Sequence, residues 1–144
     1  INPYLAYSIQ ARSHPTERTQ FTPAQPVMIQ PGRQPVFLGP VVELTGPITM
    51  SAAETFTQAL MGRTPPVTRI GEPTQGVFCD ILERRLPNGW KFALPNAVYL
   101  TGDGRAFDVI GVPPDLPVPV FDPADTAAGR DPAMAEAIRL LTKP

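Results

Sequence analysis

The segment of residues 41–71 constrains the fold most, because it predicts a strand, a helix and a second strand in succession. The apolar run at 41–45 leads into Gly46 and Pro47, and a helix is predicted from Ser51 to about Gly62. Two prolines at 65 and 66 end that helix, and residues 67–71 form a second short strand. Strands joined in this way favour parallel pairing through a right-handed crossover. The sequence therefore predicts an α/β fold with a βαβ unit.

The predicted helix has an apolar side that we expect to face the core. Its members are Ala52, Phe56, Ala59, Leu60 and Met61. Three further strands are expected, at residues 77–86, 90–94 and 97–100, the first two joined into an antiparallel hairpin by Pro87-Asn88-Gly89. Residues 116–130 are predicted to be loop. The pattern of 132–143 predicts a closing helix with Asp131 as its N-cap.

The first 35 residues are expected to be an irregular, proline-rich lead-in to a core formed by 36–144. Residues 1–11 are compatible with a short helix or with an extended strand. Between positions 12 and 35 only 27–29 has the pattern of a strand. Long irregular segments within a domain are uncommon and are often functional loops.

Composition excludes several classes of function. Twelve basic and thirteen acidic side chains give a net charge of −1, so no basic face for nucleic acid is predicted. The one cysteine, Cys79, and the one histidine, His14, exclude an internal disulfide and the common zinc sites. No apolar run reaches the roughly 18 residues of a membrane span. No metal or organic cofactor is implied. The 144 residues suit one domain, and their twenty prolines favour long connections over a helix bundle.

Ser51 has two interpretations that the spacing alone leaves open. It stands three residues before Glu54, as in a capping box in which the serine caps the helix and the glutamate bonds back to the serine amide. It also stands between a strand and a helix, where the N–H groups of the first turn and the helix dipole favour developing negative charge. A nucleophilic serine is often held in such a position.

Five stretches in order resemble the tricorn-like and C-terminal-processing serine peptidases. They are GPVVELTGPITMSAAE around Ser51, IGEPTQG at 70–76, RRLPNGW at 84–90, GVPPD at 111–115 and GRDP at 129–132. The similarity covers about residues 36–143. It implies an α/β fold with a ClpP/crotonase-like core, comprising the βαβ unit, an antiparallel hairpin region and the C-terminal helix.

The resemblance also implies roles for three residues, and Glu54 keeps the capping role that its spacing from Ser51 predicts. Ser51 would be the nucleophile, and the N–H of Ala52 would contribute to the oxyanion hole. Glu54 would fix the start of the helix as a cap. Asp108, three residues before Gly111, matches the position of a carboxylate that orients the base, although the tricorn-like residue is usually glutamate.

The general base of this family has no match in the chain. C-terminal-processing peptidases use a lysine directly after the G-E-x-T-x-G loop, where this chain has Val77, and Lys91 lies outside that motif. The tricorn-like branch uses a histidine far upstream of the serine, and His14 has no matching surroundings. Because the chain also begins with isoleucine, we expect it to be the C-terminal part of a larger catalytic domain and inactive alone.

The predicted function is therefore a serine endopeptidase that acts through an acyl-enzyme on a peptide or protein substrate. The upstream part of the same domain is the expected partner, and a homo-oligomer stays open. Two alternatives also stay open: a ligand- or peptide-binding module on the same fold, and an interaction or oligomerisation piece. Many relatives act outside the cytoplasm, so export of the parent protein is one option for its location.

Overall fold

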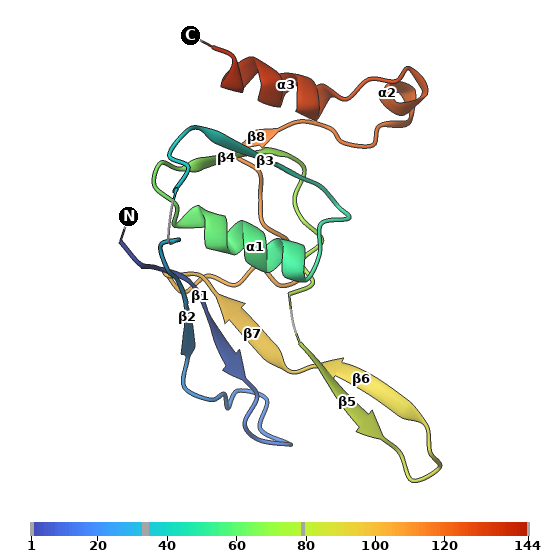
Figure 1. Ribbon diagram of the computed structural model, residues 1–144. Helices are drawn as coiled ribbons and strands as arrows, with labels where there is room; N and C mark the ends of the chain where they lie inside the picture. Colours follow the sequence, from blue (N-terminus) through green and yellow to red (C-terminus); the bar gives the residue numbers. More distant parts are fainter. Residues whose placement is uncertain (1, 33–34, 79, 144) are drawn as a thin grey trace.

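The elements of the computed structural model stack in alternating layers of sheet and helix (Figure 1). The structure describes residues 2–32, 35–78 and 80–143. The sheet of strands β1 (Tyr4–Ala11), β2 (Gln25–Ile29) and β7 (Ala97–Leu100) lies on one side of helix α1 (Ala52–Met61). On the other side of α1 lie β3 (Val41–Thr45), β4 (Val67–Gly71) and the short β8 (Leu116–Pro117), and helix α3 (Pro132–Leu141) covers their far face.

The predicted βαβ unit is confirmed. Strands β3 and β4 pair in parallel, from Val41 opposite Val67 to Thr45 opposite Gly71, and α1 connects them. Strand β8 adds to β4, also in parallel. Ile70 of β4 is fully buried against Ala133 and Ala137 of α3, so this helix closes the core on one face of the sheet.

Residues 1–35, predicted as an irregular lead-in, contain two strands of a sheet, β1 and β2, and the second of these includes the predicted strand at 27–29. Strand β1 occupies the centre of its sheet, antiparallel to β2 on one side and to β7 on the other. Of the two conformations left open for the first residues, the extended one is present. The side chains of β1 alternate only weakly in polarity. Two of them, Tyr7 and Ile9, pack against a core of Phe78, Tyr99, Phe107 and Val112. Distant pairing, rather than local pattern, decides this element.

Most of the apolar side predicted for helix α1 is not its buried side, although Met61 of that set packs against the core. The fully buried residues of α1 are Glu54, Thr57 and Gln58, whereas Phe56 is 60% exposed. Hydrogen bonding explains in part why the polar side of α1 is buried. The Thr57 hydroxyl donates to Glu43 Oε1 at 2.6 Å and to the Ala53 carbonyl at 3.0 Å. The pKa of Glu43 is raised, because burial of its carboxyl outweighs the Thr57 hydrogen bond and the charge of Arg69.

The predicted strand at 77–86 and the predicted loop at 116–130 both need correction. Strand β5 (Ile81–Arg85) begins four residues later than expected, and position 79 of that prediction lies outside the described residues. The region 116–130 contains β8 and a short helix, α2 (Pro123–Ala127), capped by Asp122. The closing helix is confirmed, with the Asp131 side chain accepting the Met134 N–H as its N-cap.

Strands β5 and β6 (Lys91–Pro95) form the predicted antiparallel hairpin, which extends away from the layered body (Figure 1). Gly89, with φ of 89°, forms its turn, and the Leu86 N–H donates to the Trp90 carbonyl. In the described ranges, no helix is long and apolar enough to cross a membrane.

Candidate active site

Ser51 lies in a strained turn at the N-terminus of α1, with φ of 54° and ψ of −118°. A positive φ is uncommon for a residue with a Cβ, and an ordinary N-cap has extended backbone angles. The turn is held through its main chain: the Ser51 N–H donates to the Val77 carbonyl at 2.9 Å and to Glu54 Oε2 at 3.1 Å. The serine side chain is exposed. Strain of this kind is retained only where surrounding contacts fix it, and it is typical of functional sites.

The Glu54 carboxylate fixes more than the helix start that the capping box predicts. It is fully buried and accepts hydrogen bonds from the Thr74 hydroxyl and the Gly76 N–H, both at 2.6 Å at Oε1. Oε2 accepts the Val77 N–H at 2.8 Å in addition to the Ser51 N–H. One carboxylate therefore joins the serine turn to the G-E-P-T-Q-G loop.

That loop is joined in turn to the segment around Asp108. The Thr74 N–H donates to the Val112 carbonyl at 3.1 Å, and the Val112 N–H donates to the Thr74 hydroxyl at 2.7 Å. A Cβ on Gly111 would lie 2.0 Å from the Thr74 carbonyl oxygen, so only glycine permits this approach. The Val109 N–H donates to the Gly76 carbonyl at 2.8 Å.

Asp108 therefore lies near the other carboxylate of the site. Desolvation raises its pKa above the ordinary value, the main-chain hydrogen bond from Phe78 offsets part of that rise, and the charge of Glu54 adds to it. Among the described residues, Asp108 Oδ2 is buried without a hydrogen-bond partner. An unpaired buried carboxylate oxygen is costly, and such atoms are frequent where a further group is meant to bind.

Ala52 is the first residue of α1 and is exposed beside Ser51. Its N–H belongs to the first helical turn, whose amides have no acceptor within the helix. The described hydrogen bonds give it no acceptor outside the helix either. This amide is thus available at the end of the helix where the dipole favours negative charge.

The two side chains considered as bases lie elsewhere. His14 is in the connection between β1 and β2, where its Nδ1 accepts the Glu17 N–H at 3.0 Å. Lys91 is in β6, opposite Arg85 in the projecting hairpin. Among the described residues no group of three or more histidine, cysteine or acidic side chains is arranged to hold a metal.

Comparison with known proteins decides the family. The family model of peptidase family S41 matches residues 4–118, most of the chain. This chain belongs to peptidase family S41. Comparison with curated proteins gives no match.

Solved structures agree with this family. A putative peptidase from Parabacteroides merdae ATCC 43184 is 27% identical, with a TM-score of 0.86 over 99% of this chain and 44% of its own. The photosystem II D1 C-terminal processing protease is 23% identical, with a TM-score of 0.61 over 99% of this chain and 33% of its own. Mature CPAF complexed with lactacystin is 20% identical over 70% of this chain and 21% of its own, with a TM-score of 0.61. The S41 chain described here thus spans less than half the length of these relatives.

The family supports two of the sequence predictions directly. The fold is α/β with the ClpP/crotonase-like core expected for S41 peptidases, and the chain belongs to a family of peptidases. Sequence reasoning missed the part played by Thr74 and Gly76, which lie opposite Glu54. The signal for them was present in the G-E-P-T-Q-G loop, but only the structure brings that loop to the serine turn.

Proposed function

We propose that the protein containing this S41 chain is a serine endopeptidase of the tricorn-like type, with Ser51 as its nucleophile. The observation that carries the proposal is the positive φ of Ser51 at the start of α1, with its side chain exposed. A sharp, strained strand-to-helix turn presents the nucleophile in other serine hydrolases. The Ser51 oxygen would attack the scissile carbonyl, and the C–N bond would break as the leaving amine takes the proton from the base. Water would then hydrolyse the resulting acyl-enzyme to a free carboxyl group and restore Ser51.

The neighbouring groups support this role. The Ala52 N–H would donate to the oxyanion, and Glu54 would hold the turn without touching the substrate. Asp108 would orient a base that takes the Ser51 proton, and its unpaired Oδ2 supports that position. The base would come from the upstream part of the same catalytic domain, so residues 1–144 alone would be inactive.

Replacing Ser51 tests the proposal in the full-length protein. We expect Ser51→Ala to abolish peptide hydrolysis and the covalent adduct that a fluorophosphonate forms with the wild type, located at Ser51 by mass spectrometry. Ser13→Ala makes the same chemical change at an exposed residue outside the site and should leave both unchanged. Hydrolysis retained in Ser51→Ala would overturn the proposal. No adduct in the wild type would favour a binding module instead.

A further inference from the structure

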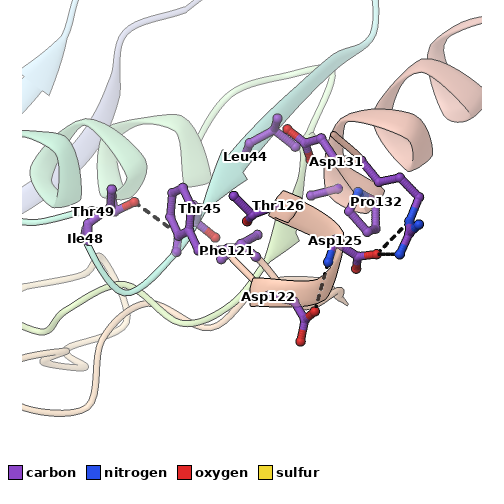
Figure 2. Close-up of a pocket in the computed structure, with 14 residues that line it drawn as sticks. Leu44, Thr45, Ile48, Thr49, Phe121, Asp122, Asp125, Thr126, Asp131 and Pro132 are labelled. Carbon is purple, nitrogen blue, oxygen red and sulfur yellow. Dashed lines mark hydrogen bonds and ion pairs between the residues drawn. The ribbon is translucent and has the colours of Figure 1, made fainter. Parts of the chain in front are cut away.

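A cavity of about 450 Å³ lies between the end of β3 and α2 (Figure 2). Its walls come from the end of β3, the turn that follows it, and the segment from Val120 to Ala133 that contains α2. The volume lies within the range of small-molecule sites. No residue that the resemblance implicates in catalysis lines it.

The inner walls of the cavity are mainly apolar. Leu44 and Ile48 contribute from the β3 side, and Val120, Phe121 and Pro132 from the opposite side. Ile48 and Phe121 are 68% and 66% exposed, and in Figure 2 the Thr126 side chain lies between the two walls. Apolar side chains this exposed at a concave surface mark a binding site more often than a solvated one.

The rim of the cavity is acidic. Three carboxylates and one guanidinium line it, giving a formal charge of −2. Asp125 pairs with Arg130 at 2.6 Å. Asp122 and Asp131 accept only main-chain N–H groups, as the N-caps of α2 and α3, and within the described residues neither pairs with a cation. An apolar interior below unpaired carboxylates is complementary to a long aliphatic stem that ends in a positive charge.

The cavity is also close to Ser51 along the chain. Thr49 lines it and stands two residues before Ser51, so their Cα atoms are at most about 7 Å apart. An extended peptide advances about 3.3 Å per residue. A side chain that enters the cavity at its Thr49 edge would therefore belong to a residue within about two positions of a carbonyl placed at Ser51.

We propose that this cavity is a specificity pocket that binds a lysine or arginine side chain of the substrate next to the cleaved bond. The occupant is a peptide, because the cavity adjoins the serine turn, and its side chain is basic, because the unpaired charges on the rim are negative. The substrate role rests on the proposed function. Binding of the basic side chain does not, and the two are tested separately.

The binding test uses the full-length protein and three small probes: the N-acetyl methylamides of lysine, norleucine and glutamate. Chemical shifts of the Thr126 and Ala133 amides report occupancy of the cavity. We expect lysine to bind about fivefold more tightly than norleucine, and glutamate more weakly than either. Equal binding of lysine and norleucine, or binding of neither, would overturn the proposal.

A double variant isolates the charge. Asp122→Asn with Asp131→Asn keeps both helix caps, because asparagine caps as well as aspartate, and it removes the two unpaired charges. The ratio of the affinity for the lysine probe to the affinity for the norleucine probe should fall to about one. Asp80→Asn with Glu83→Gln removes the same charge from exposed positions outside the cavity and should leave the preference intact. Thr126→Phe fills the cavity and should remove binding of lysine and norleucine alike.

The substrate role is read from internally quenched peptides with lysine, norleucine or glutamate at each of two positions on either side of the cleaved bond. We expect one position to favour lysine over norleucine in kcat/KM by about fivefold, and the double Asn variant to lose that ratio. If the cavity binds lysine but the lysine-to-norleucine ratio of kcat/KM is the same in the wild type and in the double Asn variant, the substrate role is wrong. If no peptide is cleaved and Ser51 is not labelled, the proposed function fails while the binding test still stands.

Discussion

Two turns of this chain, at Ser51 and at Gly89, show opposite ways of holding a loop. The turn at Ser51 is held by residues far away in the sequence, through the buried Glu54 carboxylate and the G-E-P-T-Q-G loop. The turn at Gly89 is held by its own two strands, β5 and β6, which pair with no third strand among the described residues. The first turn carries a strained serine, whereas the second carries standard hairpin geometry.

The residues that hold the Ser51 turn and those of the β5–β6 hairpin also differ in burial. Glu54 and Thr74 are buried, while every residue of β5 and β6 except Leu82 is exposed, including Leu94 at 55%. A two-stranded hairpin alone has marginal stability. The comparison teaches that the strained serine turn is located where long-range hydrogen bonds are dense, and that the projecting hairpin contributes little to the described fold.

The largest effect is expected for Glu54→Gln, which replaces one acceptor oxygen by an NH₂ group facing N–H donors. Buried charged hydrogen bonds are lost, so the free energy of unfolding should fall by about 3 kcal/mol. Urea denaturation measures this change, and hydrogen exchange of the amides at 74–77 should accelerate. Glu17→Gln, an exposed control, should change stability by less than about 0.5 kcal/mol. Equal stability of the two variants would show that the Glu54 hydrogen bonds do not hold the turn.

An effect of similar size separates close packing from backbone strain. Gly111 and Gly104 both have a positive φ, 74° and 81°, but a Cβ at Gly104 would meet nothing within 4 Å. Gly104→Ala should cost about 1 kcal/mol from strain alone. Gly111→Ala should cost at least about 2 kcal/mol more, because its Cβ would meet the Thr74 carbonyl. Similar midpoints in urea for both variants would contradict the tight contact between these loops.

Asp108→Asn should move stability and activity in opposite directions. The folded-state pKa of Asp108 is raised, so the folded protein binds more protons than the unfolded chain as pH rises from the ordinary value of 3.8 to the folded value. Wild-type stability therefore falls across that window, while the Asn variant is not affected. At pH 7 the variant should have a Tm about 2 °C higher, and below the window the gain should vanish.

Activity supplies the second half of that test. If Asp108 orients the base, kcat of the full-length protein should fall by at least about tenfold in Asp108→Asn. A higher Tm with unchanged kcat would mean that Asp108 is only a buried carboxyl without a role in the reaction.

Local patterns predicted the elements whose stabilising contacts are local. The Pro87-Asn88-Gly89 turn, the βαβ unit and the Asp131 cap of α3 are all encoded by neighbouring residues. The errors concern elements fixed by distant partners. Strand β1 depends on pairing with β7, about 90 residues later in the chain, and the buried side of α1 includes Glu54, whose partners lie in the loop at 74–77. Ser51 is a candidate nucleophile from its spacing and from the family resemblance, and that role stays a prediction; the positive φ of its turn could not be predicted from the sequence.

The smallest effect is expected in the hairpin. Trp90 is 72% exposed, so Trp90→Ser should change the free energy of unfolding of residues 1–144 by less than about 0.5 kcal/mol. The same substitution in the full-length protein sharpens the comparison, because burying a tryptophan against another surface contributes about 3 kcal/mol or more. A small change in both proteins would mean that the hairpin is solvated in both. A large loss only in the full-length protein would show that the rest of that protein covers the hairpin, and the hairpin would then be stabilised at long range like the serine turn.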